Sequence, residues 1–335
     1  MPVQVAAPAP RIPGVEDGLL LVEAEIRRWV TSSQVGFLNQ ETRQLFAAGG
    51  KRLRSALTLA MTVALGGSIG DEAVTAATSV EIVHAGSLVH DDLMDNASER
   101  RGVRTVNAEW DAGPAVMVGD FLLARAGQAA LSVSPAVADE LARTFVELAE
   151  GQTLEMLDAF NLDRSTENAL RSVSLKTGAL FRAGCVMGAL CAGATPGELE
   201  RASRYGQRFG EAFQILDDLL DLASTTELLG KPVGNDVRQG VYTLPLLRAL
   251  DDDRLAPVRQ TLAERRDRLS DEELEGILTA LQRSSFIEDT VAYARRFSEE
   301  AAAALALPAA GEALAALRDF PVAYVEWARS LIRRR

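Results

Sequence analysis

Apolar residues recur at helical intervals along almost the whole chain. From Val15 to Phe46 they fall three or four positions apart, which predicts one or two amphipathic helices. The same periodicity predicts helices over residues 55–65, 71–94, 115–131, 135–160, 165–191 and 196–222, and again from residue 240 onward, with breaks near Pro257, Pro308 and Pro321. No segment shows a convincing strand alternation. We therefore expect an all-α fold, a single large helical bundle with active residues facing a central cavity.

The edges of this pattern set the expected domain limits. Residues 1–14 are rich in Pro and Ala and lack a basic start followed by a long apolar core, so they predict a flexible N-terminal arm rather than a signal peptide. Residues 15–335 contain no dividing linker and no fixed-period repeat. They are therefore expected to form one domain.

Two clusters of aspartates interrupt the apolar helices. Asp91, Asp92 and Asp95 end the predicted helix 71–94, with Asp91 and Asp95 one helical turn apart and Asp92 a step round the same side. Like charges at this spacing repel by roughly 0.2–0.5 kcal/mol per pair, so the arrangement is easiest to understand if a cation sits among them. The same spacing recurs in the predicted helix 196–222, where the second cluster is Asp217, Asp218 and Asp221. One such cluster could be a solvated helix face. Two clusters in apolar surroundings argue against that explanation.

The residue types in these clusters favour magnesium. Carboxylates are hard oxygen ligands, and Mg²⁺ typically binds through one or two carboxylates plus substrate phosphates. Neither set of aspartates includes a Cys or His ligand, which argues against zinc. If the two helix ends face each other, several Mg²⁺ ions between them would make a bound diphosphate a good leaving group, and an allylic diphosphate would leave a carbocation behind.

Two basic segments accompany the acidic clusters. A glycine pair, Gly49 and Gly50, precedes three cations within four residues at the start of an apolar helix, and such an entrance suits a phosphate-bearing ligand. A turn with solvated basic residues fits this segment equally well when it is considered alone. A second pair of cations, Arg100 and Arg101, follows the first aspartate cluster directly.

Composition narrows the class of protein. The 335 residues carry a formal net charge of -12, which argues against general nucleic-acid binding, where a basic face is expected. Aromatic residues make up only 5%, which favours helix over sheet. The two cysteines, Cys185 and Cys191, lie in an apolar run and fit buried thiols in a reducing compartment. We find no run of about 20 uncharged apolar residues, so we expect no transmembrane segment and a cytoplasmic protein.

Several motifs occur in a fixed order from about Phe46 to Leu247. They are GGKRLR at 49–54, HDDLMD at 90–95 followed by RRG at 100–102, VGDFLLARA at 118–126, KTG at 176–178, FQILDDLLD at 213–221, GKPVGND at 230–236 and TLP at 243–245. In this order the chain resembles the trans-isoprenyl diphosphate synthases, or polyprenyl synthetases, of medium and long product length. One aspartate cluster is weak evidence, whereas the ordered set is very specific.

The resemblance implies an isoprenoid-synthase helical bundle that acts as a homodimer. Its activity would be prenyl transfer, in which isopentenyl diphosphate is joined head-to-tail to an allylic diphosphate such as farnesyl or geranylgeranyl diphosphate. Three Mg²⁺ ions would be bound with the substrate, and position by position the metal ligands would be Asp91, Asp92, Asp95, Asp217, Asp218 and Asp221. No side chain of the motifs is an obvious general base, so the proton would go to the released pyrophosphate.

The resemblance also implies roles for the polar residues around the clusters. Arg100, Lys176 and Lys231 would neutralise the allylic diphosphate. The isopentenyl diphosphate would be bound by Lys51, Arg54, His84 and Arg101. Thr177 and Gln214 would turn their oxygens toward the developing cation, beside the catalytic Asp91, Asp92, Lys176 and Asp217. His90 matches no such role and is expected to pack.

Two residues depart from the family pattern. Val241 stands where the family usually has lysine before TLP, so one phosphate-neutralising cation is missing there. Allylic binding would then rely more on Lys176 and Lys231. Ser55 replaces the proline that commonly follows GGKRLR, and we expect this change to be mild.

Product length should depend on the helix that leads into the first cluster. Val83, Gly86 and Ser87 lie eight, five and four positions before Asp91, roughly on the face along which the product would grow. The family places bulky aromatics there when products are short, and this chain has none. We therefore expect a product longer than C20, in the range of about C30 to C50, unless residues of a neighbouring helix such as Met117, Phe121 or Leu122 form a floor.

Other functions remain open at this point. A farnesyl or geranylgeranyl diphosphate synthase is the nearest alternative, and a type I terpene cyclase is more remote because a cyclase needs no basic isopentenyl site. An accessory subunit of a heteromeric synthase usually lacks intact aspartate clusters. A pure interaction bundle leaves both clusters unexplained. The C-terminal arginines, residues 333–335, are expected to be a solvated tail.

Overall fold

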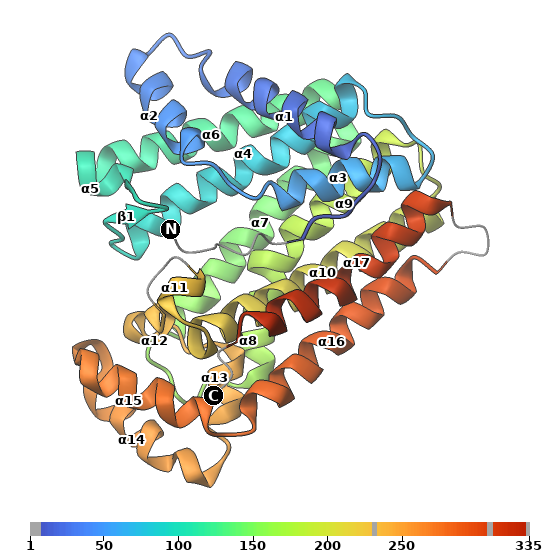
Figure 1. Cartoon of the computed structure of the whole chain (residues 1–335). Helices are drawn as coiled ribbons and strands as arrows, with labels where there is room; N and C mark the ends of the chain where they lie inside the picture. Colours follow the sequence, from blue (N-terminus) through green and yellow to red (C-terminus); the bar gives the residue numbers. More distant parts are fainter. Residues whose placement is uncertain (1–7, 230–232, 307–310, 333–335) are drawn as a thin grey trace.

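Two long helices, α4 (Asp71–Met94) and α10 (Pro196–Ala223), run through the middle of the molecule (Figure 1). The computed structural model describes residues 8–229, 233–306 and 311–332. Helices packed against α4 are α1 (Val15–Val30), α3 (Leu53–Ala64), α6 (Ala112–Val133) and α9 (Ala179–Cys191). Helices packed against α10 are α9, α16 (Phe286–Ala304) and α17 (Glu312–Ser330). The prediction of an all-α bundle is confirmed.

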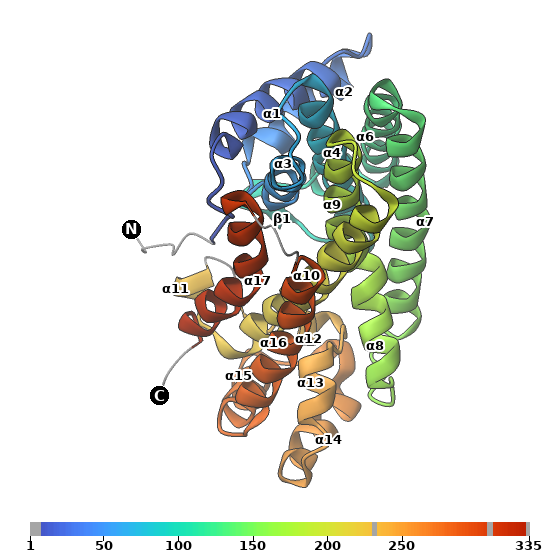
Figure 2. The same ribbon diagram turned by 90° about the vertical axis from the view of Figure 1, so that its right-hand side faces the viewer.

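The remaining helices surround these two. Figure 2 shows α6 and α7 (Pro135–Leu157) along one edge of the molecule and α17 toward the opposite edge. The other N-terminal elements are α2 (Gly36–Ala47), α5 (Val106–Trp110) and α8 (Thr166–Val173). Beyond α10 come α11 (Thr226–Leu229), α12 (Asn235–Gln239), α13 (Leu244–Ala249), α14 (Ala256–Arg265) and α15 (Asp271–Gln282), with short 3₁₀ turns at Asp253–Leu255 and Arg266–Arg268.

Local sequence explains where the long helices begin and end. α10 starts with a capping box, in which Thr195 and Glu198 each bind the other's backbone N–H, and Pro196 occupies the first helical position. α4 begins with Asp71 and Glu72, whose charges suit a helix N-terminus. It ends at Met94, as predicted, because Asn96 takes a left-handed conformation with φ 50°.

Three details differ from the sequence prediction. Residues 165–191 form α8, a π-helical turn η1 (Ser174–Gly178) and α9 rather than one continuous helix. The expected loop after the first aspartate cluster contains a short antiparallel hairpin, β1 (Glu99–Arg100) and β2 (Val103–Arg104), closed by Arg101 at φ 54° and Gly102 at φ 74°. Two residues per strand are too few to show an alternating pattern. The segment 223–239, expected to be loop, contains α11 and α12.

Part of the N-terminal segment packs against the helical core. Ile12, in the predicted N-terminal arm, is buried in the main core cluster.

Within the described ranges, α6 is the one helix long and apolar enough to cross a membrane by its composition, and 33% of its most apolar window is buried. This is weak evidence for a span, because core helices pass the same test. α6 packs against α4 and α7.

Candidate active site

The two aspartate clusters are joined through the π-helical turn. Lys176 Nζ lies 3.9 Å from Asp91 Oδ2 of the first cluster. The next residue, Thr177, donates from Oγ1 to Gln214 Oε1 over 2.7 Å, and Gln214 Nε2 donates to Asp218 Oδ1 of the second cluster over 2.7 Å. A cavity of about 130 Å³ lies here, with Asp95, Lys176, Thr177, Gln214 and Asp218 among its lining residues. Residues that the family resemblance assigned to one site, Lys176, Thr177 and Gln214, therefore lie together between the two aspartate clusters.

The three carboxylates of the first cluster lie in different surroundings. Asp91 and Asp95 are one turn apart, with the backbone N–H of Asp95 donating to the carbonyl of Asp91 over 2.8 Å. Asp92 is buried and paired with Arg100, whose Nε and Nη2 lie 2.8 and 2.7 Å from Asp92 Oδ1. Arg100, predicted to bind the allylic diphosphate, thus also neutralises an aspartate of the cluster.

The carboxyl groups are held in surroundings that disfavour their charge. Burial raises the pKa of Asp91 to about 6, against the opposing effect of Lys176, while Asp95 and Glu155 raise it further. Burial likewise raises the pKa of Asp92 and Asp95. In the second cluster burial raises the pKa of Asp218 to about 8, against the hydrogen bond from Gln214. A bound cation would relieve this cost on both sides of the cavity.

The donor set fits magnesium. All the candidate ligands are carboxylate oxygens, which suit Mg²⁺. In the described part of the chain, no three acidic, His or Cys side chains lie close enough to hold an ion by themselves. That is compatible with Mg²⁺, because this ion keeps several waters and takes further oxygens from substrate phosphates.

Asp221 and Asp217 of the second cluster differ in exposure. Asp221 is buried, and its backbone carbonyl and Oδ2 accept from the N–H groups of Gly234 and Asp236 over 2.8 and 3.3 Å. It therefore also holds the start of α12 against the end of α10. Asp217 is exposed. Lys231 lies outside the described residues, as does the arginine tail at 333–335.

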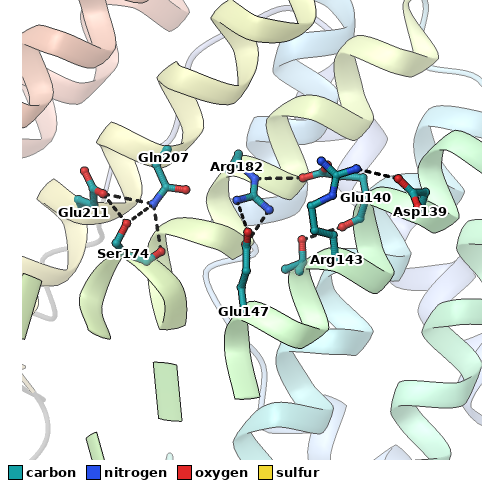
Figure 3. A network of polar contacts seen from close by, with 9 residues as sticks. Asp139, Glu140, Arg143, Glu147, Ser174, Arg182, Gln207 and Glu211 are labelled. Atoms are coloured by element: carbon teal, nitrogen blue, oxygen red, sulfur yellow. Dashed lines mark hydrogen bonds and ion pairs between the residues drawn. The ribbon is translucent and has the colours of Figure 1, made fainter. Parts of the chain in front are cut away.

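The π-helical turn is fastened to α10 by polar side chains. Ser174 Oγ donates to Glu211 Oε1 over 2.7 Å, and Gln207 Nε2 donates to the Ser174 carbonyl and Oγ over 3.0 and 2.8 Å (Figure 3). On the other side, a Cβ on Gly151 of α7 would lie only 2.8 Å from the backbone N of Lys176. Glycine at this position lets α7 approach the turn that carries Lys176.

A second polar network fixes α9 beside the turn. Arg182 Nε donates to Glu140 Oε1 over 3.1 Å, and its Nη1 donates to Glu147 Oε1 over 2.9 Å (Figure 3). Both acceptors lie on α7. The guanidinium thus joins α9 to α7 just after Lys176 and Thr177 in the chain. These contacts fix the backbone that positions the two residues.

Glu155 is a site residue that motif reasoning missed. It lies on α7, and its Oε1 accepts from Lys176 Nζ over 2.6 Å. Burial lowers the pKa of Lys176, but Asp91 and Glu155 outweigh it and the pKa is raised, so the ammonium stays charged. Glu155 follows Gly151 by one helical turn, yet nothing in the sequence distinguishes it from a solvated glutamate.

The predicted isopentenyl-binding residues form a separate basic site. Arg101 donates from Nη1 to the Gly49 carbonyl, which connects the hairpin to the GGKRLR segment. The Arg54 guanidinium lies 4.7 Å from the centre of the Phe181 ring, and Lys51 Nζ lies 5.2 Å from the Trp327 ring. By contrast, the remaining cation of the GGKRLR motif, Arg52, pairs with Glu23 and Glu81 at 2.5 and 3.7 Å.

Electrostatics places His84 among these cations. Its pKa is lowered well below the usual value, first by burial and then by Arg54 and Arg101. Burial also lowers the pKa of Arg54 to about 10, and Arg101 lowers it further against Glu81. Cations that lower one another's pKa in this way are stabilised by an anion, as the prediction of a diphosphate site requires.

The C-terminal helix α17 packs against α3, the helix that carries Arg54, and it was not predicted to take part. Tyr324 is buried, and its pKa is raised by burial and by Asp217, against the effect of Arg54. It therefore lies near both the second aspartate cluster and the basic site. The Trp327 ring beside Lys51 belongs to the same helix.

The predicted length-determining residues are placed as follows. Val83 is fully buried, and Ser87 Oγ donates to the His84 carbonyl over 2.9 Å. A Cβ on Gly86 would lie 2.9 Å from Leu123 Cδ2, so a side chain of α6 fills the space beside this glycine. Of the residues considered for a floor, Met117 is 55% exposed and Leu122 is buried.

The chain is similar in sequence to proteins of one known family. The family model for polyprenyl synthetase matches residues 35–281. The chain is 35% identical over 306 residues to heptaprenyl diphosphate synthase component 2 of Geobacillus stearothermophilus, covering 91% of this chain and 94% of the relative. It is 38% identical over 255 residues to nonaprenyl diphosphate synthase of Mycobacterium tuberculosis, covering 72% and 76%.

A solved structure extends the similarity to the fold. The decaprenyl diphosphate synthase of Rhodobacter capsulatus superposes with a TM-score of 0.84 at 31% identity, over 96% of this chain and 98% of that one. The chain therefore belongs to the polyprenyl synthetase family, and it is a prenyltransferase of the polyprenyl diphosphate synthase type.

Proposed function

We propose that this chain catalyses the Mg²⁺-dependent head-to-tail condensation of isopentenyl diphosphate with an allylic diphosphate, giving an all-trans product longer than C20. The observation that carries the proposal is the position of Lys176 and Thr177, which connect two aspartate clusters beside a separate basic site. Two diphosphate substrates need two such sites. The relatives named above are heptaprenyl, nonaprenyl and decaprenyl synthases, which supports a long product.

The acidic cavity would bind the allylic substrate. The residues that would hold Mg²⁺ are Asp91, Asp92, Asp95, Asp217, Asp218 and Asp221. The bound metal would supply the positive charge that makes the diphosphate leave. Lys176, kept charged and held by Glu155 at 2.6 Å, would neutralise the departing oxygens.

The remaining steps fall to residues on either side of the cavity. As the allylic carbon–oxygen bond breaks, Thr177 and Gln214 would present oxygen dipoles to the cation; their mutual hydrogen bond of 2.7 Å keeps them oriented. The isopentenyl diphosphate, held by Lys51, Arg54, His84 and Arg101, would attack through its double bond. The new carbon–carbon bond forms, and the proton lost from the isopentenyl unit goes to the released pyrophosphate.

Product length would be set where the growing chain meets α4. Val83, Gly86 and Ser87 carry no aromatic side chain, and we propose that they permit growth to about C30 to C50. Leu123 beside Gly86 is the nearest obstacle on α6. A floor at this residue would give the shorter farnesyl or geranylgeranyl products.

We further propose a cytoplasmic homodimer. α6 and α7 lie together along one edge of the molecule and expose apolar side chains, among them Met117, Leu131, Val146, Met156 and Leu157. Burial of this surface by a second copy would remove it from water. The name component 2 of one relative points to a different partner for that protein. Light scattering of the purified chain distinguishes a dimer from a monomer that awaits another subunit.

One product assay tests this proposal. The purified chain is incubated with Mg²⁺, farnesyl diphosphate and radiolabelled isopentenyl diphosphate, and the products are separated by chromatography. Products longer than C20 are expected. Geranylgeranyl diphosphate alone would contradict the product length, a hydrocarbon or alcohol formed without isopentenyl diphosphate would indicate a cyclase, and inactivity of the single chain would favour an accessory subunit.

A further inference from the structure

One buried cation in the acidic cavity has no role in the mechanism above. Arg164 precedes Ser165, the N-cap residue of α8, and it lines the same cavity as Lys176 and Asp218. Only 7% of its surface is exposed. A guanidinium buried this deeply needs hydrogen-bond acceptors, because a buried donor without a partner has lost its water and gained nothing in exchange.

The chain supplies Arg164 with an incomplete set of partners. Its Nε lies 3.1 Å from Asp158 Oδ2, while Asp158 Oδ1 accepts from Asn161 Nδ2 over 2.9 Å. Neither Nε nor Nη2 of Arg164 has a partner in hydrogen-bond geometry among the residues that the structure describes. The ion pair with Asp158 therefore holds the guanidinium at the cavity wall, with two buried donors that the described residues leave unsatisfied.

The loop that carries Arg164 is fixed against another part of the cavity wall. The Phe160 N–H donates to the Gly240 carbonyl over 2.8 Å, and the Phe160 ring meets the Tyr242 ring edge-on at 6.4 Å between centroids. Between these two contacts lies Val241, which also lines the cavity and carries no charge. Arg164 thus contributes a positive charge to a cavity whose wall is neutral at position 241.

We propose that Arg164 binds the diphosphate of the allylic substrate and supplies the positive charge that Val241 does not. This rests on the proposed function, because the ligand is the same diphosphate. The planar guanidinium presents two parallel donors that match phosphate oxygens, whereas a lysine at position 241 would act as a point charge. The two residues are therefore interchangeable in charge but not in geometry.

Steady-state kinetics with the full chain, Mg²⁺, farnesyl diphosphate and isopentenyl diphosphate test this. Arg164→Met is expected to raise KM for farnesyl diphosphate about tenfold and to leave KM for isopentenyl diphosphate within about twofold, because one charge-assisted contact is lost at one site. Arg164→Lys should lie between. Adding Val241→Lys to Arg164→Met returns a cation to the cavity and should recover most of the loss.

A matched control separates binding from loop support. Arg259 Nη2 lies 2.6 Å from Asp163 Oδ1 and holds the same loop from outside the cavity. Arg259→Met should leave both KM values unchanged.

Two results would overturn the inference. The first is an unchanged KM for farnesyl diphosphate in Arg164→Met; weaker inhibition by inorganic pyrophosphate in the same variant would then assign Arg164 to the released product. The second is a lowered Tm with both KM values altered and no rescue by Val241→Lys. Failure of the unaltered chain to incorporate isopentenyl diphosphate would instead contradict the proposed function.

Discussion

The two aspartate clusters share one spacing but lie in different surroundings. Asp92 of the first cluster is paired with Arg100, and Asp91 has the Lys176 ammonium at 3.9 Å. Asp218 of the second cluster is bound by the neutral amide of Gln214. Burial raises the pKa of Asp91 to about 6 against the effect of Lys176, and it raises the pKa of Asp218 to about 8 against the weaker effect of the Gln214 hydrogen bond. Two motifs of the same spacing therefore differ in the free energy needed to ionise a carboxyl group. The ionised form of Asp218 should depend more strongly on a bound cation than that of Asp91.

The largest expected effect comes from neutralising either cluster. Asp91→Asn and Asp218→Asn should each lower kcat roughly 10³-fold, several kcal/mol of transition-state stabilisation, because both clusters are needed to hold the metal. Asp139→Asn, at an exposed aspartate of α7, is the control and should have no effect. Full activity of either cluster variant would show that one cluster is sufficient.

A smaller loss is expected at the residue that orients Lys176. Glu155→Gln keeps the shape but removes the charge that holds Nζ at 2.6 Å, so kcat should fall about tenfold. Its partner control is Glu150→Gln, an exposed residue of the same helix. Single-turnover rates check the prediction, and equal rates for both variants would remove Glu155 from the account.

The close approach of α7 to the π-helical turn predicts a stability effect. Gly151→Ala would place a Cβ 2.8 Å from the Lys176 backbone N, and we expect a loss of about 1–3 kcal/mol in the free energy of unfolding. At Gly127, in α6, a Cβ would meet nothing within 4 Å. Gly127→Ala should therefore stabilise the chain by roughly 0.5–1 kcal/mol. Urea denaturation measures both, and a neutral Gly151→Ala would contradict the tight approach.

The smallest expected effect concerns the stability of the metal-free protein. Because folding raises the pKa of Asp218, its ionisation costs stability as pH rises from about 4 to about 8. Asp218→Asn should raise Tm in EDTA by roughly 2–4 °C at pH 8 and by less at pH 5. Asp92→Asn should gain less, since Arg100 offsets part of the burial cost. Thermal scans at both pH values decide whether the clusters differ as described.

The long helices and the two aspartate clusters could be predicted from residue spacing, whereas the roles of Lys176, Thr177, Gln214 and the basic residues came from the family resemblance. α4 was predicted over its observed range because its apolar pattern is bounded by acidic residues at one end and by the aspartate cluster at the other. The π-helical turn was missed because α9, which follows it, is apolar on all sides except at Arg182, so a shift in helical phase leaves no mark on the apolar pattern.

Other site residues left no signal because they act through tertiary contacts. Glu155, Arg164 and Tyr324 lie outside the motifs, and each reaches the site from a separate element. In sequence, a glutamate that binds a site lysine cannot be told apart from a glutamate on a solvated helix face. Arg52 shows the converse, since it lies inside a motif yet pairs with Glu23 and Glu81.

Binding measured with and without magnesium tests the central claim, that the two acidic clusters form one metal-dependent diphosphate site beside a metal-independent basic site. Calorimetric titration would use an unreactive farnesyl thiolodiphosphate and, separately, isopentenyl diphosphate. We expect that the allylic analogue binds only with Mg²⁺ and loses binding in both Asp91→Asn and Asp218→Asn, while isopentenyl diphosphate binds in EDTA. Equal binding of the allylic analogue in EDTA would contradict the central claim.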